Sequence, residues 1–464
     1  MEHSIQKQVI HPSTRFGLHY FPDSFHYSDQ DLEKWLPKIK ELGASWLVLI
    51  AEEKRAIPEG FLKSLIKSDI TPILHFPFSC NSSISHNELS PLLEAYSHWG
   101  VKNIIFFDRP NQRSAWGDTE WAKENLIERF IEKFLPLFQE AKKHNLTTVF
   151  PPLEPGGQYW DTIFLRESLE LMKTRISVDL LSEMVLSAYA WDNNKPINWG
   201  SGGFERWPMA KPYFTPPNIQ DQRGFRIYEW YQFIGQNILQ QNPPILLLQA
   251  GMPGLPLQHP NYIVNSKIHS DKVITILKSL AGENVYDPLF PEEALEPIPE
   301  QVIACNFWLL TTEKDDPLQS HAWFTPSLQP SLPAQSVMNW IREESLESTA
   351  DETGEDANED ISAESKTFPF SRYLLFPSLE WLLDREQRDI IQSYIEAYQP
   401  IIGFSLEEAK KSAVVTVVGD SSDFSDEQLD QIRQHGCFVS RLSLEKVTKT
   451  IDMNMEQEVN GIHH

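Results

Sequence analysis

The feature that most constrains the fold of this chain is a repeated alternation of short apolar runs with amphipathic helical stretches. Such alternation is typical of α/β proteins, in which a helix covers each strand of a parallel sheet. Eight apolar runs indicate strands at residues 15–21, 46–50, 70–76, 103–107, 147–150, 184–189, 244–248 and 302–310. A helical stretch follows each run, and residues 336–342 complete the last unit. The pattern predicts an α/β fold of the (β/α)8 TIM barrel type, with insertions in its loops.

A doubly wound open sheet is the competing fold for such a pattern, but it rarely needs eight consecutive strand–helix units. No G-x-G-x-x-G motif follows the first predicted strand, and no G-x-x-x-x-G-K motif occurs in the chain. These glycine-rich loops bind nucleotide phosphates. We therefore favour the barrel, and we expect no cofactor.

The composition changes after residue 342. The segment from Glu343 to Lys366 is rich in acidic residues, serine and threonine and has no aromatic residue. Such a segment buries too little apolar surface to fold alone, which predicts a disordered acidic linker or loop; a docking segment for a basic partner is the alternative. We thus expect four parts, namely the barrel (1–342), the linker (343–367), a small α/β domain (368–446) and a tail (447–464).

The small C-terminal domain is predicted from short apolar runs at 372–376, 401–404, 414–418 and 437–442, separated by helical stretches. The loop at 419–422 follows a strand and precedes a helix, so it could hold an anion, although a plain connection is the simpler interpretation. The run at 368–381 carries more aromatic and apolar side chains than one short strand can bury. This surplus favours an interface, and hence a homo-oligomer formed through this domain.

The charge of the chain limits its partners. It has 65 acidic and 40 basic residues, for a net charge of −25. Because phosphate groups attract basic surfaces, we expect neither nucleic acid nor a membrane as a partner, and a neutral or cationic ligand suits the chain better. No apolar run approaches the roughly 18–20 residues of a membrane span, and the N-terminus lacks the apolar core of a signal peptide.

The cysteines point to a reducing compartment. Cys80, Cys305 and Cys437 are far apart, odd in number and not arranged as C-x-x-C. Neither a disulfide framework nor a zinc cage is indicated, and no H-E-x-x-H motif argues for another metal. We expect a cytoplasmic protein with reduced thiols and no bound metal.

Candidate site residues follow from the barrel, because the loops after its strands build the functional site. Polar, acidic and aromatic side chains stand at or just after the C-terminal ends of the predicted strands, and a long loop rich in Gly and Trp follows the sixth. They are His19, Tyr20, Glu52, His75, Asp108, Arg109, Asn111, Glu154, Tyr189, Trp191, Asp192, Glu205, Gln249 and Trp308. Several have structural alternatives: the histidines and Trp308 could belong to the core, Asp108 could pair with Arg109, and Glu154 could stabilise its loop.

In this pattern the chain resembles the retaining glycoside hydrolases built on the same barrel. The resemblance covers roughly residues 15–342 and is carried by Gly17 followed by His19, by Leu42-Gly43-Ala44 at the end of the first helix, and by Trp308. It implies a saccharide ligand, with Trp308 lying beneath the sugar. Some barrel glycosidases also carry a small flavodoxin-like domain that builds the oligomer, and the C-terminal domain resembles that arrangement.

The chain departs from the family at the two residues that normally perform catalysis. The family's fourth strand ends in Asn-Glu-Pro, where this chain has Asp108-Arg109-Pro110. Its seventh strand ends in a nucleophilic Glu, where this chain has Gln249. Arginine does not give up its proton at neutral pH, and an amide does not attack an anomeric carbon as a carboxylate does.

Three hypotheses follow. The chemistry could have moved to Asp108 and Glu154, whose predicted strands are neighbours about 4.8 Å apart and could hold two carboxyls at the spacing of either a retaining or an inverting enzyme. The barrel could instead be a catalytically inactive pseudoenzyme that binds a small saccharide or oligosaccharide. An unrelated chemistry or a scaffold role is the third.

Overall fold

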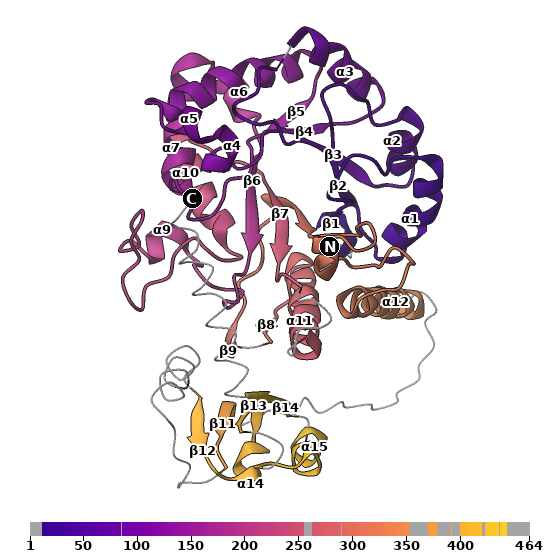
Figure 1. Ribbon diagram of the computed structural model, residues 1–464, viewed down its shortest axis with the longest axis vertical. Coiled ribbons are helices and arrows are strands. Elements are labelled where there is room, and N and C mark those ends of the chain that lie inside the picture. The colour runs from indigo at the N-terminus through magenta and orange to yellow at the C-terminus, as the bar shows by residue number, and fades with distance from the viewer. Residues whose placement is uncertain are drawn as a thin grey trace, which may run out of the picture. The chain divides into compact units, whose positions relative to one another are not determined.

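The computed structural model describes residues 12–84, 86–254, 262–288, 290–351, 370–377, 391, 400–419, 423–435 and 437–442. The chain divides into two compact units (Figure 1). The first comprises Met1–Pro288 and Glu293–Gly354, and the second comprises Leu289–Glu292 and Glu355–His464.

The first unit contains an eight-stranded parallel sheet in the order β5-β4-β3-β2-β1-β10-β7-β6. An isolated parallel bridge between Val149 and Val185, together with a hydrogen bond from the Phe150 N–H to the Val185 carbonyl (2.8 Å), brings the two outer strands together. The sheet is thereby a nearly closed barrel, which confirms the predicted α/β barrel. Its strands are β1 (Phe16–His19), β2 (Trp46–Ile50), β3 (Thr71–Phe76), β4 (Asn103–Phe106), β5 (Thr147–Val149), β6 (Leu186–Trp191), β7 (Ile245–Gly251) and β10 (Val302–Phe307).

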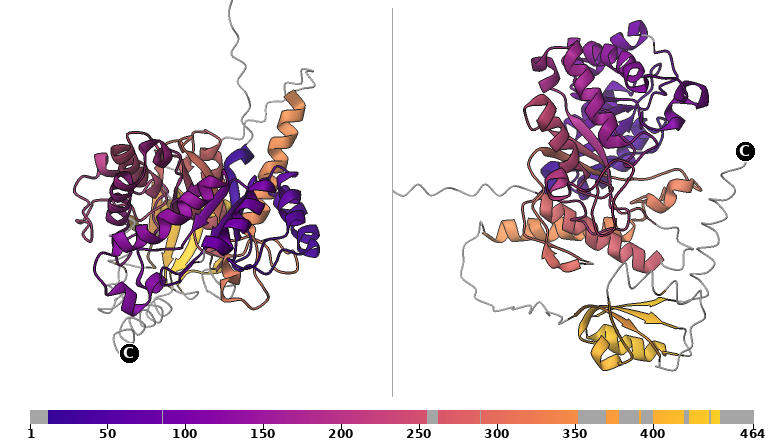
Figure 2. Two further views of the ribbon diagram at one scale, coloured as in Figure 1. Left: turned by 90° about the horizontal axis from the view of Figure 1, so that it is seen from above. Right: turned by 90° about the vertical axis from the view of Figure 1, so that its left-hand side faces the viewer.

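Helices surround this sheet on the outside, as Figures 1 and 2 show. The longer ones are α1 (Asp29–Glu41), α2 (Glu59–Ile66), α3 (His86–His98), α6 (Leu126–Lys143), α7 (Asp161–Arg175), α10 (Ile227–Leu239), α11 (Tyr262–Leu280) and α12 (Leu332–Asp351). Shorter elements lie in the loops: η1 (Pro12–Arg15), α4 (Arg113–Trp116), α5 (Asp118–Trp121), α8 (Val178–Ser182), α9 (Gly203–Arg206), η2 (Pro317–His321) and the paired strands β8 (Tyr286–Asp287) and β9 (Phe290–Ala294).

Local sequence signals account for the helix ends. The Ser28 side chain accepts a hydrogen bond from the Asp31 N–H, and the Asp31 side chain accepts from the Ser28 N–H, so a capping box begins α1. Gly43 follows this helix with φ of 67°, a left-handed conformation that glycine adopts without steric cost. Ser28 and Gly43 thus mark the two ends of α1.

Two apolar cores hold the barrel together. The larger lies between the strands and the surrounding helices, where α6 alone buries Phe130, Phe134 and Phe138. The smaller fills the barrel interior with side chains from strands all round it. Its members are Val48, Ile73, Ile105, Val149, Val185, Tyr189, Leu246, Leu248 and Ala304.

The predicted boundary at residue 342 falls inside a helix. Helix α12 continues to Asp351, because five of the nine residues at 343–351 are Glu, Leu or Ala, which favour helices even where net charge is high. The division between the two units follows Gly354. The remainder of the expected linker, residues 352–367, lies outside the described residues.

The second unit contains a four-stranded parallel sheet in the order β12-β11-β13-β14. Its strands are β11 (Phe370–Leu375), β12 (Ile401–Gly403), β13 (Ser412–Val418) and β14 (Phe438–Leu442), and its described helices are α14 (Leu406–Ala409) and α15 (Asp426–Gln434). The expected anion loop, apart from Gly419, and the tail at 447–464 lie outside the described residues. Of the apolar run at 368–381, residues 370–377 are described, and Tyr373, Leu374, Leu375 and Phe376 among them are buried.

Candidate functional site

A network around one arginine lies at the C-terminal ends of four strands. Arg109, just after β4, donates from Nε to Glu154 Oε2 (2.7 Å), from Nη1 to Asp108 Oδ2 (2.8 Å) and from Nη2 to Gln249 Oε1 (3.0 Å). Tyr189 of β6 joins it, because its hydroxyl donates to Asp108 Oδ1 (2.5 Å). We call these five residues the arginine network. The Asp108, Arg109 and Glu154 side chains are 27%, 30% and 40% exposed, so a ligand can reach them.

Charge and burial set the chemical state of the network. The Arg109 guanidinium lies 4.1 Å from the centroid of the Tyr189 ring, and this cation–π contact also orients the plane of the guanidinium. Burial and the neighbouring Asp108 carboxylate raise the pKa of Tyr189 well above its usual value. The phenol therefore keeps its proton and remains a donor. Trp191 extends the network by donating from Nε1 to Gln249 Oε1 (3.3 Å).

Two buried histidines lie beside the network. His75 donates from Nε2 to the Phe107 carbonyl (2.9 Å), and His19 accepts from the Gln249 N–H at Nε2 (3.4 Å). Burial lowers the pKa of both histidines, and the positive Arg109 nearby acts in the same direction. Both are therefore neutral near pH 7. The Trp308 ring lies edge-on to His19, with centroids 4.8 Å apart, which places Trp308 on the same side of the barrel.

The backbone at these strand ends is unusual. Phe107, Arg109 and Gln249 have φ values of 68°, 43° and 46°, in the left-handed region that side chains larger than glycine seldom occupy. Such conformations cost energy, and they cluster at functional sites where the surrounding structure enforces them. Arg109 after β4 and Gln249 near the end of β7 both have this left-handed conformation, and their side chains lie within hydrogen-bonding distance of each other.

Besides His19, His75, Tyr189 and Gln249, three further expected residues are buried, namely Asn111, Tyr20 and Asp192. Asn111 accepts from the Glu154 N–H (2.8 Å) and donates to the carbonyls of Glu154 (2.9 Å) and Tyr159 (3.0 Å). It therefore positions the Glu154 backbone. Tyr20 packs in the core, and Asp192 forms a buried ion pair with Lys272 (2.6 Å). The sequence marks these residues as following strands, but burial depends on which loops fold over them.

Two other expected residues have contacts of their own. Glu52, after β2, accepts from Arg55 (2.8 Å) and from the Ser24 hydroxyl. Glu205 lies exposed on the short helix α9. Neither has a described contact with the arginine network.

Asp221 organises the long loop between β6 and α10, and the sequence did not single it out. This buried carboxylate accepts from Trp199 Nε1 (3.0 Å), the Thr215 hydroxyl (3.0 Å) and Arg223 Nε (2.8 Å). Burial alone would raise its pKa, but the hydrogen bonds from Arg223 and Trp199 and the Lys195 charge lower it to about 2. The Asp-Gln-Arg triplet at 221–223 was the available signal, since an aspartate two residues before an arginine can form a local ion pair.

The same loop presents an apolar tip, the aromatic hairpin, which we define as residues 209–214. Lys211 and Phe214 exchange two backbone hydrogen bonds of 3.0 Å, and the Tyr213 hydroxyl accepts from the Trp160 N–H (2.9 Å). Met209, Tyr213 and Phe214 are nevertheless 55%, 61% and 61% exposed. The hairpin is thus anchored at the start of α7 while its large side chains remain open to solvent.

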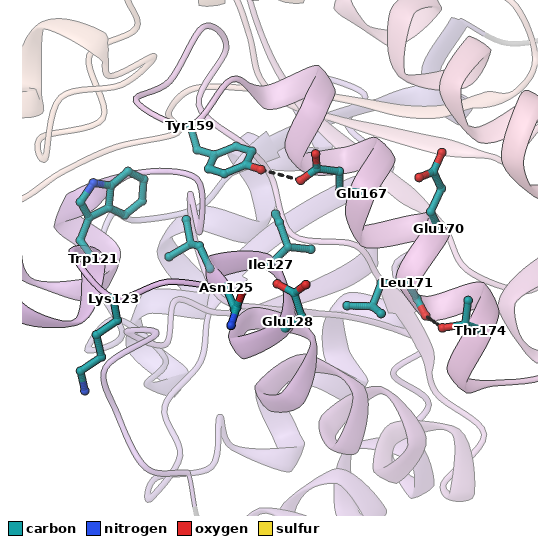
Figure 3. Close-up of a pocket in the computed structure, with 11 residues that line it drawn as sticks. Trp121, Lys123, Asn125, Ile127, Glu128, Tyr159, Glu167, Glu170, Leu171 and Thr174 are labelled. Atoms are coloured by element: carbon teal, nitrogen blue, oxygen red, sulfur yellow. Dashed lines mark hydrogen bonds between the residues drawn. The ribbon is translucent and has the colours of Figure 1, made fainter.

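A groove of about 730 Å³ lies on the outer wall of the barrel, between the α5–α6 connection and α7 (Figure 3). On its α7 side the Tyr159 hydroxyl donates to Glu167 Oε2 (2.5 Å). No member of the arginine network lines it. Its lining residues are Trp121, Lys123, Asn125, Leu126, Ile127, Glu128, Tyr159, Glu167, Glu170, Leu171 and Thr174.

Two further observations concern only the described ranges. Within them, His, Cys, Asp and Glu side chains form no group of three or more that could hold a metal ion. Among the described helices, none combines the length and apolar character that crossing a membrane requires.

The comparisons with known proteins give similarity to glycoside hydrolases through structure alone. No protein-family model matches this chain, and no curated protein matches it in sequence. Matching solved structures include a family 39 glycoside hydrolase from the gut symbiont Bacteroides cellulosilyticus WH2, with 12% identity, a TM-score of 0.45, and coverage of 71% of this chain and 64% of that one. Xylanase 10B from Thermotoga maritima matches with 12% identity, a TM-score of 0.42, and coverage of 72% and 97%.

The exo-β-1,4-mannosidase Op5Man5 from Opitutaceae bacterium strain TAV5 matches over 90% of this chain and 79% of its own length, with 8% identity and a TM-score of 0.39. At these identities the similarity concerns fold, so the chemistry of this chain has to be argued from its own residues.

Proposed function

We propose that this protein binds a saccharide at the C-terminal rim of its barrel and does not hydrolyse it. The observation that carries the proposal is the position of Arg109, whose guanidinium binds both candidate carboxylates and Gln249. The expected partner is a small saccharide or oligosaccharide.

Hydrolysis by this class of barrel needs one carboxylic acid that protonates the leaving oxygen and one carboxylate that acts as nucleophile or base. Asp108 accepts a hydrogen bond on each of its oxygens, from Tyr189 and from Arg109, so in this arrangement both oxygens already serve as acceptors for protein donors. Glu154 is held by the same guanidinium. The family's nucleophile position is an amide, Gln249, and the family's acid position is Arg109 itself.

Binding a saccharide needs only hydrogen-bonding groups and an apolar surface for the sugar, and the rim has both. Partly exposed carboxylates at Asp108 and Glu154 can accept hydrogen bonds from sugar hydroxyls, and bonds to charged acceptors are the stronger ones. The half-buried rings of Trp191 and Trp308 can cover the apolar face of a pyranose. A rim of mixed polar and aromatic groups, positioned by a rigid barrel, is the usual composition of a small-molecule site.

Hydrolysis through Asp108 and Glu154 is the second candidate function. It is favoured by one observation: the two carboxylates follow neighbouring strands, bind a single guanidinium and stay partly exposed. A ligand that displaced Arg109 would leave two carboxylates facing the same space.

A panel of chromogenic glycosides, paired with calorimetric titration of the corresponding free saccharides, tests the proposal on the full chain. We expect no turnover above background, and saturable binding of at least one saccharide that Asp108→Asn weakens about tenfold through loss of a charged acceptor. Glu205→Gln, an exposed carboxylate elsewhere, is the matched control. Turnover that Asp108→Asn abolishes would establish the hydrolase instead, and absence of any saccharide binding would refute the proposal.

We also propose that residues 368–446 form a flavodoxin-like domain that mediates self-association. The sheet order β12-β11-β13-β14 corresponds to the 2-1-3-4 order of the flavodoxin type. The end strand β12 and the residue after it leave Ile401, Ile402 and Phe404 more than 40% exposed. Among the described strands none lies beyond β12, and an edge strand with apolar side chains is a template for pairing with a second copy of the chain.

A further inference from the structure

His26 makes a two-sided contact between two loops on the rim. It lies between β1 and α1, with its ring parallel to that of Phe21 at a centroid distance of 3.8 Å. Its Nδ1 is 2.8 Å from Asp23 Oδ1 in the same loop, and its Nε2 is 2.7 Å from Glu313 Oε1 in the segment that follows β10.

The geometry requires a particular protonation state. Both partners are carboxylate oxygens, which accept hydrogen bonds, so both ring nitrogens of His26 must carry hydrogen. A neutral imidazole has one N–H and one lone pair, and it could satisfy only one of the two carboxylates. The two-sided contact therefore exists only in the imidazolium form.

The segment that contains Glu313 lies next to residues of the binding rim. It follows Trp308, which lies against His19, and it contains His321, whose ring lies 6.2 Å from that of Trp191. The Leu310 N–H also donates to the His19 carbonyl (2.7 Å), so the start of the segment is tied to β1. Glu313 is 67% exposed, and His26 supplies its described ion pair.

We propose that His26 is a protonation-controlled clasp that fixes the segment 311–321 to the β1–α1 loop and so orders one side of the rim. The clasp is closed when the ring is doubly protonated and opens when it loses a proton. The inference concerns the order of the rim and stands whether or not the ligand is a saccharide.

The surroundings set the pH range. Burial alone would lower the pKa of His26, but Asp23 and Glu313 raise it above its ordinary value. The pKa of Asp23 is itself lowered, through its bonds to His26 and the Phe25 N–H and through the charges of His26 and Arg55. Arg55 approaches from the β2–α2 loop, where it also binds Glu52 (2.8 Å). The clasp is thus closed while His26 is protonated and both carboxylates are ionised, and it opens as pH rises through the raised pKa of His26.

Hydrogen–deuterium exchange of the full chain, corrected for intrinsic exchange and compared between about pH 6 and about pH 9, tests the clasp. We expect protection of the segment 311–321 to fall up to about fivefold as pH rises, which is the range for a partly exposed ion pair. His26→Gln and Glu313→Gln should each give the low protection at every pH. His98→Gln, an exposed histidine of α3, should behave as the wild type.

Two outcomes would overturn the proposal. Protection of 311–321 in the wild type could stay constant over the whole pH range, or His26→Gln could keep the pH dependence of the wild type. If His26→Gln failed to fold, Glu313→Gln would still decide the matter, because that side chain is mostly exposed and its replacement leaves Asp23 and the Phe21 contact in place.

Discussion

Asp192 and Lys272 form a buried ion pair next to the rim of the barrel. Their Oδ2 and Nζ atoms are 2.6 Å apart, both side chains are 1% exposed, and Lys272 also donates to the Lys195 carbonyl (2.9 Å). The Asp192 N–H donates to the Gly251 carbonyl (2.9 Å). The pair therefore joins the end of β6 to α11, beside the strand that carries Gln249.

Replacement of Lys272 by methionine should destabilise the barrel by about 3–5 kcal/mol, the usual cost of leaving a buried charge without its partner. Burial already raises the pKa of Asp192 despite Lys272, so the variant should take up a proton there on folding near neutral pH. Urea unfolding followed by tryptophan fluorescence measures the loss. The double variant Asp192→Asn/Lys272→Met should be more stable than the single one; equal stability would contradict the ion-pair explanation.

At the scale of elements, the loop between β6 and α10 depends on the ionised form of Asp221. Its pKa in the folded protein is about 2, below the ordinary value near 4, because Arg223 and Trp199 donate to the carboxylate. A lowered pKa contributes stability that is fully present above the unfolded value and is lost as pH falls through the folded one. The loop, and the aromatic hairpin on it, should therefore loosen in acid.

Asp221→Asn should reduce stability by roughly 2 kcal/mol at neutral pH and should flatten the loss of stability between about pH 4 and about pH 2. Thermal melts across that range measure both effects. Asp118→Asn, at a carboxylate that is 80% exposed and bound to Arg113, is the matched control and should change little. A wild-type profile that is flat over this range would show that Asp221 does not hold the loop.

The aromatic hairpin should contribute to ligand binding if the saccharide extends beyond the arginine network. Trp160, which anchors the hairpin, is the residue just before α7. It ends the β5–α7 loop, which also carries Glu154 of the arginine network. Phe214→Ala should weaken binding of an oligosaccharide about fivefold without lowering the melting temperature, because the ring is exposed in the free protein. Tyr286→Ala, an exposed aromatic residue on β8, serves as the control; an equal effect there would remove any specific role for the hairpin.

At the scale of the whole molecule, the chain combines a nearly closed barrel with a second unit built on a small sheet. Light scattering on the full chain should give a mass above that of a monomer, whereas a chain ending at Gly354 should be monomeric. The physical reason is the exposed apolar edge at β12, which the shorter chain lacks. Monomers in both cases would contradict the proposed self-association.

Much of the barrel could be predicted from its sequence. All eight strands lie where the apolar runs predicted them, because strands buried on both faces have to be apolar along their whole length. The strand pair β8–β9 was missed, since two short polar strands in a loop leave no periodic pattern. The helical start of the acidic segment was also missed. Its high charge indicated disorder, whereas its glutamates favoured a helix.

The sequence by itself determined the order of the elements and, with it, the set of side chains that stand at one end of the barrel. Apolar periodicity and helix caps are local properties, and closure of a parallel sheet brings the strand ends together. Only the tertiary structure decided which of those side chains meet. Arg109 binds Gln249, 140 residues away, while Asn111 and Asp192 turn inward and are buried. Such contacts depend on loop paths and left-handed strand ends, which no local pattern specifies.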